Sequence, residues 1–320
     1  MTAPSLSLVA DVGGTNTRVA LARGGAVDAG SIRRFPNAEH AGLASVLTAY
    51  LGAAATGPVE GACVAVAGPV DGGVARLTNL DWTIDPASVA AATGARRIAI
   101  INDLQAQGYA LGHIAPTHLR PLVPASGPLR AAHPQLVIGV GTGFNAAVVH
   151  DTPSGPVVTA SECGHVTLPV RSEADLSLMR HVETAHGFAG VEDVLSGRGL
   201  ERLHAWAARE AGRDTRLKAS DIVAAIGAAE DPVAEATGAT FVRLLGTVAG
   251  DLALIHLPFG GIYLIGGVAR AFTPHFERFG FAAAFHDKGR FSALVGEIPV
   301  SIIEDDYAAL TGCARRLAAG

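Results

Sequence analysis

A glycine-rich turn close to the start of the chain could bind an anion. Residues 11–18 read Asp-Val-Gly-Gly-Thr-Asn-Thr-Arg and separate two apolar runs. Consecutive backbone amides in a glycine turn form a concavity that accepts phosphate oxygens, because glycine lets the backbone approach closely. Thr15 and Asn16 add hydrogen-bond donors, and Asp11 could hold Mg²⁺ through water. The same pattern fits a plain hairpin turn, so this segment alone leaves both interpretations open.

A second glycine turn lies at residues 139–143, Gly-Val-Gly-Thr-Gly. It fails the dinucleotide-binding pattern GxGxxG, because residue 144 is Phe and another apolar run follows. The Walker A loop and the protein-kinase motifs each need a lysine that neither Lys218 nor Lys288 supplies. These three kinds of nucleotide site are therefore excluded.

Two polar residues, Asn102 and Asp103, follow the apolar run at residues 97–101. The end of a buried parallel strand is the usual ligand position in α/β folds. A helix cap is the simpler interpretation of this pair, because Asn and Asp are favoured where helices start. Position alone favours the cap.

Further polar groups lie in two glycine-rich segments. Residues 161–165 read Ser-Glu-Cys-Gly-His, which sets Glu162 and His165 three residues apart, and Glu192 lies within residues 190–197. Carboxylates, an amide and an imidazole gathered on one cleft would suit sugar hydroxyls, which both donate and accept hydrogen bonds. Taken separately, each residue also fits a cap or a surface group.

The composition excludes several classes of protein. The 320 residues are 49% hydrophobic and 17% charged, too apolar for a disordered chain and long enough for two domains. With 24 basic against 29 acidic residues, a net charge of −5 and no basic block, we expect no nucleic-acid and no membrane partner. The three cysteines are scattered without a CxxC pair. That argues against a disulfide framework and a structural zinc site, and favours a cytoplasmic protein.

No signal-peptide pattern opens the chain. The most apolar stretch, residues 252–269, has about the length of a membrane span but is interrupted by Pro258 and the glycine pair at 260–261. We interpret it as the end of a core helix, a turn and a buried strand, and expect a soluble protein.

Apolar periodicity predicts an α/β chain with residues 116–134 as a linker or hinge. Residues 8–21 and 136–149 each read as strand, glycine turn and strand in the same register, which indicates a duplicated half. Asp231-Pro232 is typical of a helix N-cap followed by proline at the first helical position. The expected strands are residues 6–10, 18–22, 62–67, 97–101, 262–265 and 300–303, and the expected helices are residues 41–51, 103–111, 232–257 and 307–319.

Together these segments resemble one family, the bacterial glucokinases of the hexokinase-like group in the actin-like ATPase superfamily. The matching stretches run in family order from residue 8 to residue 314, so the resemblance covers nearly the whole chain. They are LVADVGGTNTR, AGPVDG, LTNLDW, IINDLQA, GVGTGFN, SECGHV, VEDVLSGRGL, GGIYLIGGV, FHDKGRF and LTGCA. The cysteine run that binds zinc in the related ROK sugar kinases (repressor, open reading frame, kinase) is absent, which argues against that group and against zinc.

The resemblance implies a duplicated α/β fold of the actin-like ATPase (RNase H-like) type, with two domains and a sugar and ATP cleft between them. Residues 1–113 with 304–320 would form a small domain that carries the first phosphate turn and the catalytic aspartate. Residues 114–303 would form a large domain with the second phosphate turn and the sugar and adenosine contacts. The domains would close over the sugar and exclude water.

The resemblance also implies transfer of the γ-phosphoryl group of ATP to the 6-hydroxyl of glucose, giving glucose 6-phosphate and ADP, with Asp103 as the base. The sugar would be bound by Asn102, Asp103, Glu162, His165, Glu192 and Thr142. The nucleotide, with Mg²⁺ near Asp11, would be bound by Asp11, Gly13, Gly14, Thr15 and Asn16, by Gly141, Thr142 and Gly143, and by Gly266 and Gly267. As in the family, we expect a cytoplasmic, glycolytic homodimer.

Two residues depart from the family pattern. The second turn reads GTGFN where GTGLG is usual, and we expect Asn145 to keep the loop by adopting positive φ. Cys163 replaces a glycine between Glu162 and the Gly-His pair, so we expect it to reshape the sugar pocket and affect its specificity.

Three other functions stay open at this point. The chain could be a kinase for another hexose, such as mannose or an amino sugar, or use a phosphoryl donor other than ATP. It could be a sugar sensor that catalyses little. It could also be an actin-like filament protein, although such a protein would have no reason to keep Asn102, Asp103, Glu162 and Glu192.

Overall fold

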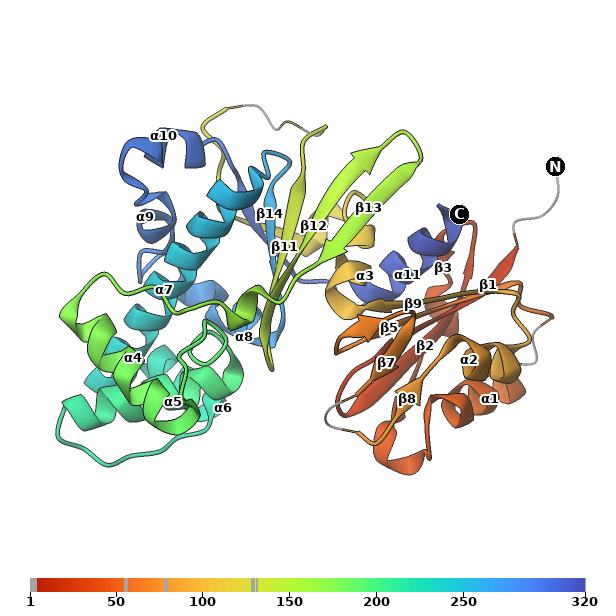
Figure 1. The fold of residues 1–320 in the computed structure, drawn as a ribbon, viewed down its shortest axis with the longest axis horizontal. Helices are drawn as coiled ribbons and strands as arrows, with labels where there is room; N and C mark the ends of the chain where they lie inside the picture. The colour runs from red at the N-terminus through yellow and green to blue at the C-terminus, as the bar shows by residue number, and fades with distance from the viewer. Residues whose placement is uncertain (1–4, 55–56, 78–79, 128–129, 131, 320) are drawn as a thin grey trace. The chain divides into compact units, whose positions relative to one another are not determined.

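The computed structural model describes residues 5–54, 57–77, 80–127, 130 and 132–319 (Figure 1). The chain divides into two compact units. Unit 1 comprises residues 1–115, 151–160 and 305–320, and unit 2 comprises residues 116–150 and 161–304. Thr78 and Asn79 of the LTNLDW stretch lie outside the described residues, as do 128, 129 and 131 of the expected linker.

Unit 1 is built on a mixed sheet in which the first strand of an N-terminal hairpin runs parallel to two later strands. The hairpin joins β1 and β2 antiparallel, and β1, β5 and β9 run parallel. Every residue of β5 is buried, as its continuous apolar sequence predicts for a strand covered on both faces. The strands are β1 (Leu6–Val12), β2 (Asn16–Arg23), β3 (Ala26–Val27), β4 (Arg33–Pro36), β5 (Gly61–Val66) and β9 (Arg97–Asn102), in the order β3-β2-β1-β5-β9 with β4 beside β2.

Helices cover both faces of this sheet (Figure 1). Side chains alternate along β1, so that Leu8 packs with α1 (Leu43–Ala54) in one core, while Val9 packs with α11 (Ala308–Ala318) in another. The other elements of unit 1 are α2 (Pro86–Thr93), α3 (Asp103–Ala110), and a small sheet of β6 (Val70–Asp71), β7 (Val74–Arg76) and β8 (Thr83–Ile84).

A second six-stranded sheet, whose strands belong to unit 2 except for the end of β12 and all of β13, repeats the hairpin and the parallel strands. β11 pairs antiparallel with β12, and β11, β14 and β15 run parallel. The strands are β10 (Leu119–Val123), β11 (Gln135–Val140), β12 (Phe144–Thr152), β13 (Gly155–Ala160), β14 (Ile262–Ile265) and β15 (Val300–Ile303), in the order β10-β15-β14-β11-β12-β13. The expected similarity of residues 8–21 and 136–149 is confirmed at the level of the hairpins.

The expected identical register of the two hairpins is wrong beyond the turn. Val12 pairs with Thr17, whereas Val140 pairs with Phe144. The second turn is therefore one residue shorter, because Gly141 already closes on Gly143 through its backbone amide.

A 25-residue helix, α7 (Pro232–His256), forms the centre of unit 2. Asp231 caps it by accepting the Val233 amide, and Pro232 occupies the first turn, as expected. Among the described residues it is the one helix long and apolar enough to cross a membrane, yet 67% of its most apolar window is buried inside the structure, as in a core helix. The other helices of unit 2 are α4 (Glu173–His186), α5 (Gly197–Glu210), α6 (Ala219–Ala228), α8 (Gly267–Phe272), α9 (Phe281–His286) and α10 (Ser292–Val295).

Short 3₁₀ helices connect these elements. They are η1 (Ala29–Ser31), η2 (Asn37–Glu39), η3 (Pro116–His118), η4 (Cys163–His165), η5 (Thr273–His275) and η6 (Gly289–Phe291). The expected strands and helices are confirmed, with ends that move by up to a few residues.

Two expectations about organisation are wrong. The segment at 116–134 is not all linker, since it contains η3 and the edge strand β10, which pairs with β15 and changes register between Pro121 and Val123. A proline is tolerated there because an edge strand needs only one row of hydrogen bonds. Residues 151–160, expected in the second domain, belong to unit 1, where the Gln105 side chain donates to the Val158 carbonyl at 2.9 Å.

The contact between α3 and α11 provides a test of the packing in unit 1. A Cβ on Gly312 would lie 1.6 Å from the Ala106 carbonyl oxygen. We therefore expect Gly312→Ala to lower the free energy of unfolding by about 1–3 kcal/mol, as overpacking does.

Urea denaturation is the measurement, with Gly52→Ala as the matched control. Gly52 also lies in a helix, α1, but an added Cβ would meet no atom of the described residues within 4 Å. The control should gain about 0.5–1 kcal/mol, since alanine favours helices over glycine. Equal stabilities of the two variants would contradict the described contact.

Candidate active site

In unit 1, the first glycine turn is closed and held by a buried asparagine. The Gly13 amide donates to the Asn16 carbonyl at 3.0 Å. Asn37 donates its side-chain amide to the Gly13 carbonyl at 2.8 Å, accepts the Thr17 hydroxyl at 2.8 Å, and donates its backbone amide to the Thr15 carbonyl at 2.9 Å. Sequence analysis missed Asn37, because nothing in its local sequence marks it as a partner of the turn.

This anchoring leaves the tip of the turn accessible. Gly14 and Thr15 are exposed, whereas Val12 and Thr17 on either side are buried. Thr15 and its neighbouring amides can therefore meet a ligand without any change in the strands.

Asp11 and Asp103 form a pair of carboxylates in unit 1. Asp11 accepts a hydrogen bond from the Arg18 guanidinium at 3.0 Å, and its pKa is raised because burial outweighs the lowering by Arg18. The pKa of Asp103 is raised to about 7, first by burial and then by the negative charge of Asp11. The charge of Asp11 thus influences the protonation of Asp103.

Asn102 is the N-cap of α3, so the cap interpretation of this residue is confirmed. Its side-chain oxygen accepts the Leu104 amide at 2.9 Å, and its side-chain nitrogen donates to the Gly68 carbonyl at 3.0 Å. Gln105 completes the capping box by accepting the Asn102 amide at 3.1 Å. An amide side chain can make further bonds beyond these two, so capping leaves Asn102 able to contact a ligand.

In unit 2, the second glycine turn meets the starts of two helices. The Gly197 amide, at the first position of α5, donates to the Gly141 carbonyl at 2.8 Å. A Cβ on Gly266, the residue before α8, would lie 2.3 Å from the Val140 carbonyl oxygen. The structure therefore brings Gly266 and Gly267 against the turn, and it adds Gly197, which sequence analysis missed although it lies in the quoted stretch VEDVLSGRGL.

Glu192 packs directly onto the same turn. Its carboxylate accepts the Phe144 amide at 2.9 Å, and its own amide donates to the Gly164 carbonyl at 2.8 Å. A Cβ on Gly143 would lie 2.5 Å from the Glu192 carboxylate, and one on Gly164 would lie 2.0 Å from the Phe144 carbonyl oxygen. These glycines are thus required by lack of space.

The remaining predicted residues of unit 2 lie beside Glu192. Glu162 accepts a hydrogen bond from the Asn145 side chain at 3.2 Å, and His165 lies 4.0 Å from the same carboxylate oxygen. Glu162, His165 and Thr142 are exposed. All three side chains can therefore meet a ligand. Glu162 offers a carboxylate, Thr142 a hydroxyl and His165 an imidazole.

The expectation that Asn145 adopts positive φ is wrong. Among the described residues, the non-glycine positions with positive φ are Ala229 and Leu257. Asn145 lies in β12 opposite Gly139 and needs no unusual backbone. Its side chain accepts the Cys163 amide at 3.1 Å and the Cys163 thiol at 3.6 Å, so the two departures from the family pattern contact each other.

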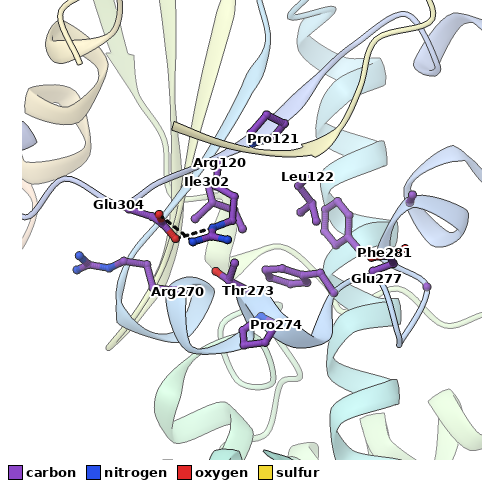
Figure 2. A pocket seen from close by; sticks show the side chains of 13 residues that line it. Arg120, Pro121, Leu122, Arg270, Thr273, Pro274, Glu277, Phe281, Ile302 and Glu304 are labelled. Atoms are coloured by element: carbon purple, nitrogen blue, oxygen red, sulfur yellow. Dashed lines mark hydrogen bonds and ion pairs between the residues drawn. The ribbon is translucent and has the colours of Figure 1, made fainter. Parts of the chain in front are cut away.

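Unit 2 also holds a cavity of about 710 Å³ bounded by β10, β15 and the segment from α8 to α9 (Figure 2). Arg120 and Glu304 lie at one end and are joined by a hydrogen bond of 2.8 Å, and Phe281 and Glu277 lie at the other. None of the residues singled out in the sequence lines it. Within the part of the chain that the structure describes, no group of three or more His, Cys, Asp or Glu side chains could hold a metal ion.

Comparisons with known proteins agree on one family. The glucokinase family model matches residues 8–319. The glucokinase of Cupriavidus pinatubonensis is 34% identical over 317 residues, which cover 97% of this chain and 92% of the relative. The glucokinase of Marinobacter nauticus is 32% identical over 318 residues, which cover 99% and 98%.

Solved structures have the same fold. A glucokinase from an Antarctic psychrotroph is 31% identical, with a TM-score of 0.86 and 98% of both chains covered. A Balamuthia mandrillaris glucokinase in complex with glucose is 23% identical, with a TM-score of 0.81 and coverage of 99% of this chain and 94% of that one. A Streptomyces griseus ROK glucokinase in complex with glucose and AMPPNP is 20% identical, with a TM-score of 0.62 and coverage of 97% and 98%.

The last two likenesses concern the fold alone, whereas the family model and the relatives above 30% identity span nearly all of the chain. The chain therefore belongs to the glucokinase family and is a sugar kinase that acts on glucose.

Proposed function

We propose that the chain transfers the γ-phosphoryl group of ATP to the 6-hydroxyl of glucose, with Asp103 as the general base. The observation that carries the base assignment is the environment of Asp103. It follows strand β9 at the first position of α3, and burial with the nearby Asp11 charge raises its pKa to about 7. A base is most effective when its pKa lies near the operating pH.

The two carboxylates differ in a way that supports separate roles. Asp11 is paired with Arg18, whereas the groups that donate hydrogen bonds to Asp103 are neutral: the backbone amides of Leu104 and of Asp103 itself, and the side chain of Asn102. In acid–base sites, the environments of two neighbouring carboxylates typically push their pKa values apart. In the reaction, Asp103 takes the hydroxyl proton while the sugar oxygen bonds to phosphorus and the bond from phosphorus to ADP breaks.

The sugar hydroxyls would be bound by Asn102 and by the polar cluster of unit 2, which comprises Thr142, Glu162, His165 and Glu192. The unit 2 cluster supports this role because it presents two carboxylates, a hydroxyl and an imidazole around one turn. Glucose is also the sugar named for the complexes of two structures with the same fold. These groups orient the sugar, which matters because phosphoryl transfer depends mostly on positioning.

The nucleotide phosphates would be bound by the two glycine turns. In unit 1 these contacts come from Asp11, Gly13, Gly14, Thr15 and Asn16, and in unit 2 from Gly141, Thr142 and Gly143, with Gly266 and Gly267 near the adenosine. The start of the 14-residue helix α5 at the second turn supports an anion there, because a helix N-terminus carries partial positive charge. AMPPNP in the related ROK glucokinase supports ATP as the donor.

The residues around the first turn fit Mg²⁺. This ion prefers oxygen ligands, keeps several waters and is usually held by one or two carboxylates together with substrate phosphates. Asp11 offers a carboxylate next to the exposed turn, and the charge of Asp103 nearby adds a field that favours a cation. Asp11 would hold the ion through water, and the bound ion would neutralise charge on the phosphates.

Each unit would supply part of the chemistry. Unit 1 would be the small domain and would carry the base and the first phosphate turn. Unit 2 would be the large domain and would carry the sugar and adenosine contacts. By family resemblance we also propose a cytoplasmic homodimer whose product enters glycolysis.

Cys163, half-buried beside Glu162, is the observation that favours a second candidate, a kinase for another hexose such as mannose or an amino sugar.

Replacement of the base tests the reaction. We expect Asp103→Ala to lower kcat by about 10²–10⁴-fold, because a positioned base contributes that much, and to change the KM for glucose less. A coupled assay for sugar phosphate with Mg-ATP and glucose, mannose, fructose or N-acetylglucosamine measures both. Asp85→Ala is the control, since Asp85 also starts a helix of unit 1 but only caps it.

A preference for another sugar would keep the mechanism and change the substrate. Full turnover by Asp103→Ala would overturn the base assignment. Sugar binding by calorimetry without turnover on any sugar would favour a sensor instead of a kinase.

The pH dependence tests the environment of Asp103. Because only the ionised carboxylate accepts a proton, kcat should fall about tenfold per pH unit below about pH 7. Asp11→Asn removes the charge that raises the pKa of Asp103, so the acidic limb of its residual activity should move to lower pH. Rate profiles of both proteins over pH 5–9 measure this shift, and an unmoved limb would contradict the coupling.

Stability should show the same titration with a defined sign. The ordinary pKa of an aspartate is 3.8, so between pH 3.8 and about 7 the folded state holds a proton that the unfolded state has lost. The protonated Asp103 side chain therefore makes its full contribution to the stability of the folded state below pH 3.8, and this contribution is lost as the pH rises to about 7.

Asp103→Asn cannot ionise and avoids this loss. Its Tm relative to the unsubstituted protein should rise between pH 4 and pH 7 and stay level above, in thermal melts across that range. If the difference in Tm were constant at all pH values, ionisation of Asp103 would not destabilise the folded state.

A further inference from the structure

One side chain ties the start of the 161–165 segment to β12. The Asn145 side-chain oxygen accepts the Ser161 hydroxyl at 3.1 Å, the Cys163 amide at 3.1 Å and the Ala146 amide at 2.8 Å. Its nitrogen donates to the Ser161 carbonyl and, at 3.2 Å, to the Glu162 carboxylate.

These contacts determine which way the amide points. The oxygen faces three donors, and the thiol of Cys163 at 3.6 Å also approaches it. The reverse orientation would set the nitrogen against those donors and the oxygen against a carbonyl and a carboxylate. The donor end is therefore committed to Glu162.

Glu162 depends on this contact for its position. Its side chain is 63% exposed, and the residue caps no helix with its side chain. The other polar side chain described near its carboxylate is His165, at 4.0 Å from the oxygen that Asn145 contacts. A solvated glutamate side chain loses rotamer freedom when it is held, so a preset orientation lowers the entropic cost of binding a ligand.

The chemistry of the contact suits a sugar. Asn145 is neutral, so it orients Glu162 without neutralising it. It occupies one carboxylate oxygen, Oε2, and leaves Oε1 able to accept a sugar hydroxyl.

We propose that Asn145 is a positioning residue that holds Glu162 ready for the sugar. The proposal rests on the sugar-binding role of Glu162 in the proposed function. It also assigns a use to the two departures from the family pattern, because Cys163 helps to orient the Asn145 amide that holds its neighbour Glu162.

Sugar kinetics of Asn145→Ala test the proposal. Loss of one hydrogen bond to a charged group should raise the KM for the preferred sugar about five- to tenfold, with the KM for ATP unchanged. Ser161→Ala is the matched control, since it removes the hydroxyl contacts to Asn145 and to the Ala146 carbonyl but none to Glu162. Both variants should lose some thermal stability, and the control should keep its KM for sugar.

Asn145→Asp covers the case in which the alanine variant fails to fold. It keeps the acceptor oxygen and its three contacts but sets a second carboxylate oxygen against Glu162. Like charges repel, so the KM for sugar should rise at least as much as in Asn145→Ala.

A cycle with Glu162→Ala separates positioning from a general structural role. If Asn145 acts through Glu162, adding Asn145→Ala to Glu162→Ala should raise the KM for sugar no further. An equal rise in both backgrounds, or no rise in either, would overturn the proposal. An unchanged KM in Glu162→Ala alone would instead remove the sugar role of Glu162, and the proposed function would fail at that residue first.

Discussion

Unit 1 brings two carboxylates, Asp11 and Asp103, to one edge of its sheet, where burial raises the pKa of both. The strands β1 and β9 lie on either side of β5 and run parallel to it, so their carboxyl ends reach the same edge of the sheet. Asp11 is the last residue but one of β1, and Asp103 follows β9. Their repulsion is relieved unequally, because Arg18 pairs with Asp11 alone. Asp103 is left as the carboxylate that changes its protonation near neutral pH.

The neighbouring elements serve this arrangement. Asn102 and Gln105 form a capping box that starts α3 directly after β9, which fixes the backbone of Asp103. Asn37 fixes the glycine turn that follows Asp11. The packing of α11 against α3, so close that Gly312 has no room for a Cβ, holds the helix in place. The first glycine turn and Asp103 are thus positioned by one sheet edge.

In unit 2, the contacts around the second glycine turn require glycines, because a Cβ would not fit at these positions. Gly143, Gly164 and Gly266 each lie where a Cβ would meet another group within 2.5 Å, and each allows one segment to reach the second turn. Glu192 and the 162–165 segment approach it through two of these gaps. The polar cluster around this turn is therefore assembled by close backbone approach, and Asn145 adds the side-chain contacts that the glycines cannot make.

The inner strands of both main sheets and the long helix α7 could be predicted from periodicity and caps, because both are local. Buried parallel strands such as β5 read as continuous apolar runs, and Asp231-Pro232 marks the start of α7. The edge strand β10 was missed, since a short strand with a proline carries little periodic signal. Asn37 and Gly197 were missed because their roles depend on partners more than 20 residues away along the chain.

The sequence by itself determined the family, the order of the main strands and the candidate site residues, because motifs and apolar patterns are written along the chain. Only the tertiary structure decided how those residues act. It raised the pKa of Asp103 through burial and the charge of Asp11, and it joined Asn145 to Glu162 and Cys163. Desolvation and contacts between distant segments arise when the chain packs, so no local pattern encodes them.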